Sequence, residues 1–232
     1  MNVLITGASQ GLGYAIAEIF AKKGNRILLS ARNEVRLYHA LETLQTHYPE
    51  TDFSAKAFDL SIKEEAIALG TWALAFGAPD VLVNNAGLFE PGNISNEADG
   101  ALESQLAVNL YSAYHLTRAL LPAMKERRQG FIFNMCSIAG LRAYPNGGSY
   151  SISKFALNGF SQNLREELKP FGIKVAAIFP GAVKTASWGD FDNSKQRIME
   201  AADVAKLIET ATQLSAGACV EDIILRPQLG DL

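Results

Sequence analysis

The sequence predicts one α/β domain, built on a doubly wound sheet of about seven parallel strands with helices on both faces. Short apolar runs alternate with helical stretches of ten residues or more along all 232 residues. This alternation is typical of parallel strands joined by right-handed crossovers. No internal repeat, low-complexity tract or linker divides the chain. We therefore expect residues 1–232 to form a single domain.

The predicted strands are short apolar runs, because strands of a parallel sheet are buried on both faces. The first run, Val3-Leu4-Ile5, leads directly into a glycine-rich turn, and Ile27-Leu28-Leu29-Ser30 is nearly as apolar. By this criterion the expected strands, in chain order, are 3–5, 27–30, 53–58, 81–83, 131–135, 174–179 and 222–225.

The predicted helices lie between these runs. In the first of them Ile16, Ile19 and Phe20 fall on one stripe, and Gly24 follows where a helix C-cap belongs. The expected helices are 13–23, 34–47, 63–76, 97–127 and 150–169. Residues 182–200 are polar and poorly periodic. A loop of this length in a compact domain is more often functional than idle, so we expect a flap over the site.

Composition excludes several classes of function. The net charge of -3 offers no electrostatic case for binding nucleic acid or an anionic membrane. Two cysteines are too few for a disulfide framework, and the three histidines show no metal-ligand spacing, so we expect no metal site. A basic leader and an apolar span of about 20 residues are both missing. A cytoplasmic protein is the resulting expectation.

A glycine-rich turn, Thr6 to Gly13, separates the first strand from the first helix. The missing side chains at Gly7, Gly11 and Gly13 let a pyrophosphate approach the backbone, and the N–H groups at the helix N-terminus attract it. The spacing Gly-x-x-x-Gly-x-Gly differs from the commoner Gly-x-Gly-x-x-Gly. Its place between an apolar strand and an amphipathic helix predicts a dinucleotide site and a fold of the Rossmann type.

The second strand ends in Ser30-Ala31-Arg32-Asn33, where a NAD-binding chain would carry an acid. An arginine there can pair with a 2′-phosphate, which an aspartate would repel. Arg32 therefore favours NADP(H) as the cofactor. The alternative interpretation is that Arg32 is a solvated residue at the start of a helix.

A possible catalytic cluster follows the fifth strand. Tyr150 and Lys154 are four positions apart and share one helix face, and Ser137 follows the strand that precedes this helix. Ligands of open α/β sheets bind at the carboxyl ends of strands. A nearby ammonium stabilises phenolate and lowers a tyrosine pKa from its usual ~10. Such a group is suited to donate a proton to a developing alkoxide. The pattern predicts a hydride-transferring enzyme.

With these motifs the chain resembles the short-chain dehydrogenase/reductase family over nearly its full length. The matching segments are the turn 6–13, Asn84-Asn85-Ala86-Gly87, the tetrad Asn109, Ser137, Tyr150 and Lys154, and Pro180-Gly181 with Thr185. The resemblance implies that Tyr150 donates the proton and Ser137 hydrogen-bonds the substrate carbonyl. It further implies that Lys154 binds the nicotinamide ribose and lowers the Tyr150 pKa, and that Asn109 holds a water in a proton relay.

The resemblance and the glycine turn together imply a set of residues that contact the cofactor. Asp59 and Leu60 would contact adenine, and Asn85 to Gly87 the ribose region. Gln10 stands where some NADP-dependent members carry a second basic residue. The full set is Gly7, Ser9, Gln10, Gly11, Leu12, Gly13, Arg32, Asn33, Asp59, Leu60, Asn85, Ala86, Gly87, Tyr150, Lys154, Pro180, Gly181, Val183 and Thr185.

The C-terminal part of the chain resembles the bacterial sepiapterin-reductase-like branch of the family, in segments 180–183, 188–189, 220–227 and 230–232. A carboxylate could accept the adjacent N–H groups of a pterin ring. Asp231 is our first choice for this carboxylate, with Asp222 or Asp190 as alternatives, although such acids are often solvated surface residues. The expected substrate residues are Ser137, Tyr144, Trp188 and Asp231. Trp188 could instead anchor its loop.

The leading hypothesis is an NADPH-dependent carbonyl reductase with a small-molecule substrate. One alternative is a 3-oxoacyl-carrier-protein reductase or general ketoreductase, for which a basic patch beside the site would be expected. The predicted flap has no such excess of positive charge. A second alternative is a dinucleotide-sensing protein without catalysis, which would be expected to have lost Tyr150 or Lys154. The resemblance also implies a homodimer or homotetramer that uses the helices from Glu97 and Tyr150.

Overall fold

All seven strands of the chain lie in one parallel sheet. The computed structural model describes residues 1–185 and 188–231, and its strand order is β3-β2-β1-β4-β5-β6-β7. Every neighbouring pair is parallel. The strands are β1 (Asn2–Thr6), β2 (Arg26–Ala31), β3 (Phe53–Ala57), β4 (Val81–Asn84), β5 (Gly130–Met135), β6 (Ile173–Pro180) and β7 (Asp222–Leu225). The predicted doubly wound α/β fold is confirmed.

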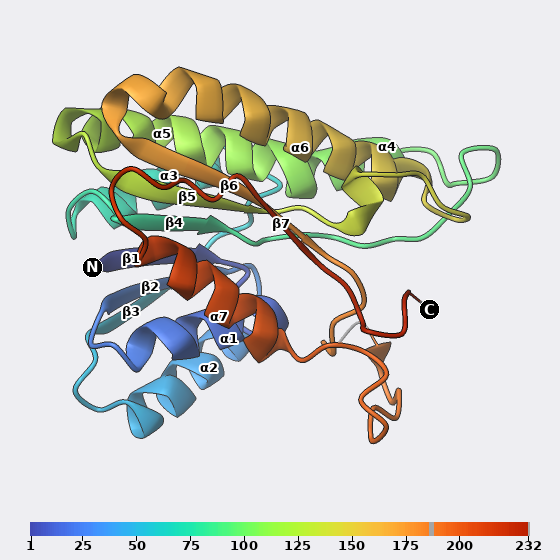
Figure 1. Cartoon of the computed structure of the whole chain (residues 1–232), viewed down its shortest axis with the longest axis horizontal. Helices are drawn as coiled ribbons and strands as arrows, with labels where there is room; N and C mark the ends of the chain where they lie inside the picture. The colour runs from blue at the N-terminus through green and yellow to red at the C-terminus, as the bar shows by residue number, and fades with distance from the viewer. Residues whose placement is uncertain (186–187, 232) are drawn as a thin grey trace.

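Helices cover both faces of the sheet (Figure 1). One face carries α1 (Gly11–Ala21), α2 (Glu34–His47) and α7 (Ala201–Thr212), and the other carries α3 (Lys63–Leu74), α5 (Ser112–Arg127) and α6 (Gly148–Leu168). Three apolar clusters of the described residues fill the space between the sheet and these layers. The strand order reverses between β1 and β4, and the ends of these strands are where an open sheet of this kind binds its ligand.

The long helix expected at 97–127 is interrupted. Gly100 is left-handed, with φ of 84°, and the short helix α4 (Ala101–Leu106) starts after it. A π-helical segment, η1 (Ala107–Tyr111), then joins α4 to α5. The wider turn of a π-helix re-aims the side chains that it carries, and such segments are frequent at functional sites. The residue re-aimed here is Asn109.

Helix α7 was not predicted, although its sequence carries a helical signal. Glu200 and Asp203 form a capping box at its start. Val204, Ala205 and Ile208 are buried on one face, and this face packs beside α1. The apolar spacing was therefore sufficient to predict the helix that precedes β7.

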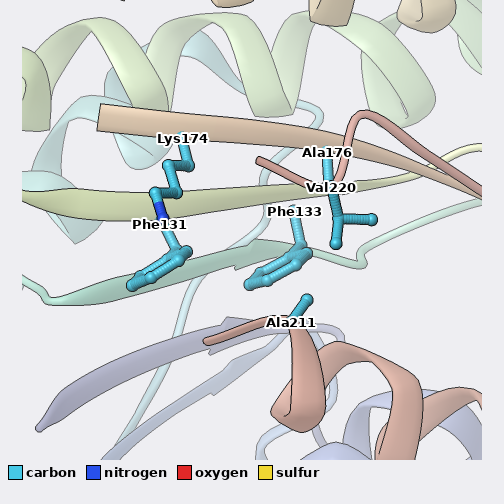
Figure 2. A pocket seen from close by; sticks show the side chains of 6 residues that line it. All are labelled: Phe131, Phe133, Lys174, Ala176, Ala211 and Val220. Carbon is cyan, nitrogen blue, oxygen red and sulfur yellow. The ribbon is translucent and has the colours of Figure 1, made fainter. Parts of the chain in front are cut away.

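A small pocket lies between β5, β6 and α7 (Figure 2). The parallel rings of Phe131 and Phe133 extend from β5 toward Ala211, with Lys174 above the first ring. The volume is about 10 Å³, which is room for roughly one water molecule. This pocket is too small for a cofactor or a substrate.

Candidate active site

A much larger cavity, of about 1080 Å³, opens at the carboxyl ends of the strands. The predicted site residues on its wall are Gly7, Ser9, Gln10, Gly11, Leu12, Arg32, Asn33, Asp59, Leu60, Asn85, Ala86, Gly87, Ser137, Tyr144, Tyr150, Lys154, Pro180, Gly181, Val183, Thr185, Trp188 and Asp231. Two predicted residues, Gly13 and Asn109, do not line it. The volume is at the upper end of the range for cofactor sites.

The glycine turn is shaped by steric contact. Gly7 and Gly11 are left-handed, with φ of 63° and 58°, a conformation that L side chains rarely adopt. A Cβ on Gly13 would lie 2.3 Å from the carbonyl oxygen of Gly7. Gly13 therefore lets α1 pack against the turn and is not part of the cavity wall.

Thr6 and Asn85 hold the turn against the end of β4. The Thr6 hydroxyl accepts hydrogen bonds from the backbone N–H groups of Asn85 and Ala86, both at 2.9 Å. The Asn85 side-chain amide donates to the carbonyl oxygens of Thr6 and Gly7, at 2.9 and 3.1 Å. Asn85 lines the cavity as expected, but its side-chain N–H groups are committed to the turn. Its predicted contact with the ribose must come from other atoms.

Two arginines, Arg32 and Arg36, lie at the end of the cavity next to β2. Asn33 caps α2 and accepts a hydrogen bond from the Arg36 backbone N–H at 2.9 Å, and the Arg36 guanidinium donates to Gln10 Oε1 at 3.4 Å. Arg36 was not among the residues expected from the sequence, although it lies one helical turn after Arg32. Two guanidinium groups at a helix N-terminus are suited to bind a phosphate. This arrangement favours the phosphate interpretation of Arg32 over a solvated residue.

Ser137 and Tyr150 meet at the centre of the cavity wall. Ser137 caps the short 3₁₀ helix η2 (Ile138–Gly140), and its hydroxyl accepts from the Ala139 N–H at 3.2 Å. The Tyr150 ring packs edge-to-face on Phe89, with ring centroids 4.8 Å apart. Burial raises the pKa of Tyr150 to about 12, and the hydrogen bond with Ser137 opposes this rise. The phenol therefore carries its proton at neutral pH.

Lys154 is buried one helical turn beyond Tyr150. Its ammonium donates to the carbonyl oxygen of Met135 at 2.8 Å and lies 5.7 Å from the Tyr150 ring centroid. Burial lowers the pKa of Lys154 to about 8. The expected lowering of the Tyr150 pKa by Lys154 is not seen, because loss of solvent around the phenol has the largest effect and raises that pKa. Lys154 is not among the groups that shift this pKa; Ser137 is the one that lowers it.

The Asn109 side chain is hydrogen-bonded to other groups of the protein through both its oxygen and its nitrogen. Its Oδ1 accepts from the Leu88 N–H at 2.7 Å, and its Nδ2 donates to the Leu88 carbonyl oxygen and to Ser153 Oγ, both at 2.9 Å. Asn109 thus fastens the segment after β4 to α6. The side-chain amide is engaged in these bonds, and its expected role in holding a water stays a prediction.

The other end of the cavity contains the expected substrate residues. Tyr144, Trp188 and Asp231 all line it, and the Trp188 ring packs edge-on against Phe191 with centroids 5.2 Å apart. Asp222 lies on β7 and pairs with Arg165 at 3.0 Å, so it is engaged away from the cavity. Asp190 does not line the cavity either.

The Asp231 carboxylate is already bound by two arginines. Arg226 Nε donates to Oδ1 at 3.2 Å and its Nη2 also donates to Oδ2, while Arg142 Nη2 donates to Oδ2 at 3.2 Å. The hydrogen bond from Arg226 and the charges of both arginines hold the pKa of Asp231 below its usual range. This carboxylate is therefore not a free acceptor for a pterin ring.

The predicted flap, 182–200, is anchored at its base. Val183 and Met199 form an isolated β-bridge, and Met199 N–H donates to the Ala182 carbonyl oxygen at 3.0 Å. Thr185 lies beside the glycine turn, since a Cβ on Gly11 would be 3.3 Å from its methyl group. Ala186 and Ser187 belong to the predicted flap but lie outside the described residues.

The described residues hold neither a membrane-spanning helix nor a cluster of metal-ligating side chains. No helix in residues 1–185 and 188–231 is both long and apolar enough to cross a bilayer. Within the same ranges, no three side chains of His, Cys, Asp or Glu come together where they could hold a metal ion.

A cavity of this size at the switch point of a parallel sheet, with a glycine turn at one end and Ser137, Tyr150 and Lys154 on its wall, defines a dinucleotide-dependent oxidoreductase. The profile of the short chain dehydrogenase family matches residues 1–196, and the chain belongs to this family. It is therefore an oxidoreductase that acts on alcohol or carbonyl groups.

Three similar proteins illustrate the match. An uncharacterized oxidoreductase of Staphylococcus saprophyticus is 32% identical over 225 residues, which cover 97% of this chain and 96% of the relative. A metagenomic short-chain oxidoreductase, solved in complex with NADP, is 30% identical with a TM-score of 0.84, over 97% of this chain and 96% of the other. L-sorbose reductase from Gluconobacter frateurii, solved with NADPH and L-sorbose, is 27% identical with a TM-score of 0.86, over 96% and 93% of the two chains.

Proposed function

We propose that this protein reduces a carbonyl group to an alcohol, with NADP(H) as its cofactor. The observation that carries the proposal is that Ser137, Tyr150 and Lys154 lie together on the wall of the cavity that begins at the glycine turn. The bound cofactor supplies a hydride to the carbonyl carbon. Tyr150 gives its hydroxyl proton to the carbonyl oxygen, and solvent returns that proton afterwards.

Each protein group has a distinct role in this proposal. Ser137 hydrogen-bonds the carbonyl oxygen and so orients it toward Tyr150. Because the pKa of Tyr150 is raised to about 12, the phenol is in the acid form that protonates an alkoxide. Lys154, held by Met135, presents its ammonium to the ribose and to the phenolate that forms during the reaction. This attraction grows as the negative charge develops.

Two groups of residues at one end of the cavity would hold the cofactor. The N–H groups of the glycine turn receive the pyrophosphate, and Arg32 and Arg36 receive the 2′-phosphate. Similar proteins that were crystallised with NADP and NADPH support NADP(H) as the cofactor.

A spectrophotometric assay of NADPH oxidation against a panel of carbonyl compounds tests the proposal. The panel contains sepiapterin, a small diketone, a quinone and an acetoacetyl thioester. We expect at least one to be converted to its alcohol, with one NADPH consumed per product. A protein that binds NADPH tightly but reduces no member would support the dinucleotide-sensing alternative instead.

The same panel separates the finer candidates for the substrate. The resemblance of the C-terminal segments predicted a pterin side-chain carbonyl as the substrate, with Asp231 accepting hydrogen bonds from the ring. Asp231 is paired with two arginines, so the structure does not favour this candidate. No reduction of sepiapterin would end the pterin hypothesis. Preference for the thioester would favour the 3-oxoacyl alternative. The cytoplasmic location expected from the sequence stays a prediction.

We also propose that the chain forms a homodimer, or a tetramer built from such dimers, through α5 and α6. These helices lie side by side in Figure 1, and the rings of Tyr114 and Phe160 join them at 5.6 Å. These two helices and the adjoining end of η1 carry large apolar side chains with 37–48% of their area exposed, namely Tyr111, Tyr114, Ile152 and Phe155. Burying such a patch against a second copy is favourable.

Sedimentation of Phe155→Arg tests this assembly. We expect the wild type to sediment as a dimer or tetramer at micromolar concentration and the variant to dissociate, because a charge would be buried without a partner. Val35→Arg on α2, an exposed apolar side chain on the other face of the sheet, is the matched control and should leave the assembly intact. A monomeric wild type would contradict the proposal.

A further inference from the structure

A cluster of charged side chains closes the substrate end of the cavity. It consists of Asp231, Arg226 from the segment after β7, and Arg142 from the segment after η2. The Asp231 carboxylate also touches the motif that follows β6, since a Cβ on Gly181 would be 3.0 Å from its Oδ1. Two positive charges thus face one negative charge beside the residues expected to contact the nicotinamide.

Arg142 contributes least of the three to holding the C-terminal tail, residues 226–231, in place. Arg226 binds both carboxylate oxygens of Asp231 in the forked geometry typical of arginine–carboxylate pairs. Arg197 holds the tail backbone, with bonds of 2.8 Å to the Gly230 carbonyl oxygen and 3.1 Å to that of Asp231. The fork and these two bonds fix the tail without any contribution from Arg142.

Arg142 has unused capacity to bind an anion. In the part of the chain that the structure describes, its guanidinium has one hydrogen bond, to an oxygen that Arg226 already binds. An arginine has five N–H donors. The Arg142 side chain lines the cavity together with Ser137 and Tyr144, and 64% of it is exposed.

The rest of this end of the cavity is apolar or aromatic. Leu88, Phe89, Tyr144 and Trp188 line it, and Arg142, Lys154 and Asp231 are the charged residues that the described chain places there. Lys154 is buried and bound to Met135, which leaves Arg142 as the cation that a substrate can reach. A carbonyl compound held between aromatic rings would place a second polar group near this guanidinium.

We propose that Arg142 recognises a carboxylate on the substrate, so that the protein prefers carbonyl compounds that carry an acid group. The Asp231 carboxylate, which Arg142 binds in this structure, shows the group that the site accepts. An incoming carboxylate takes a forked bond to Arg142, and Asp231 keeps its fork with Arg226. This inference rests on the proposed carbonyl reductase function and adds the class of substrate to it.

A matched pair of substrates tests the inference: 4-carboxybenzaldehyde, which is an anion at neutral pH, and its neutral methyl ester. We expect wild-type kcat/KM to be higher for the acid. Arg142→Gln should lower kcat/KM for the acid at least about tenfold, mainly through KM, and change the ester less than threefold. Arg142→Lys should lose less activity toward the acid than Arg142→Gln, because lysine keeps the positive charge. The recovery should be partial, because lysine cannot make the forked pair of hydrogen bonds.

Two further variants sharpen the result. Lys22→Gln removes the same charge from a position away from the cavity and should leave the acid-to-ester ratio unchanged. Asp231→Asn removes the carboxylate that competes with the substrate for Arg142, so it should raise the acid-to-ester ratio. A pterin-binding role for Asp231 predicts no such rise.

The possible failures are distinguishable. An enzyme that reduces the ester but shows no selective loss for the acid in Arg142→Gln would overturn this inference and leave the reductase function intact. Equal losses for both substrates would also overturn it, because they would indicate a structural role for Arg142. A wild type that reduces neither aldehyde nor any member of the larger panel would contradict the proposed function itself.

Discussion

Replacing Tyr150 with phenylalanine should lower kcat by at least ~10²-fold, the low end for general acid catalysis. The variant keeps the ring and its edge-to-face contact with Phe89 but loses the hydroxyl that donates the proton in the proposed reaction. No other group with a suitable proton is assigned to the carbonyl oxygen. Steady-state kinetics with the best substrate of the panel measure the loss.

Binding of NADPH by the same variant should be nearly unchanged, because Lys154 and the glycine turn remain in place. Fluorescence titration with NADPH measures the dissociation constant. Tyr38→Phe, the same change on the exposed surface of α2, is the matched control and should retain full activity. Activity of Tyr150→Phe within threefold of the wild type would remove Tyr150 from its assigned role.

The second large effect concerns the choice between NADPH and NADH. The double substitution Ala31→Asp with Arg32→Ala should shift the ratio of kcat/KM values toward NADH by at least tenfold. It exchanges a charge-assisted hydrogen bond to the 2′-phosphate, worth ~1.5–3 kcal/mol, for repulsion. Tenfold corresponds to about 1.4 kcal/mol, so the loss of one such bond is sufficient.

Arg36 should contribute to the same preference. Arg36→Gln alone is expected to weaken NADPH binding while leaving NADH binding within twofold, and its effect should add to that of the double substitution. Lys22→Gln serves as the charge control. An unchanged NADPH-to-NADH ratio in all variants would show that the phosphate is bound elsewhere.

Much of this protein was predictable because its local sequence carries the necessary signals. Apolar runs such as Val3-Leu4-Ile5 and the glycine turn after them are local patterns, and they predicted the parallel sheet and the place of the dinucleotide. The spacing of Tyr150 and Lys154 likewise depends only on the period of a helix. The same motifs predicted the short-chain dehydrogenase/reductase family, and the family profile that matches residues 1–196 confirms it.

The features that were missed depend on contacts between distant residues or on burial. The interruption at η1 accompanies the bonds between Asn109 and Leu88, which lie 21 positions apart. The direction of the shift in the Tyr150 pKa depends on how completely the fold removes solvent from the phenol. The four-residue spacing between Tyr150 and Lys154 carries no information about this burial.

The fold class and the family were predictable from the sequence alone, and so were the central residues of the candidate site as a prediction, because period, turn chemistry and motif spacing are properties of neighbouring residues. The tertiary structure alone decided what surrounds them. It brought Arg36 to the cavity beside Gln10, and it paired Asp231 with Arg142 across 89 positions of the chain. Whether a carboxylate is free to bind substrate or is already neutralised depends on such distant partners, because charges interact through space and not along the sequence.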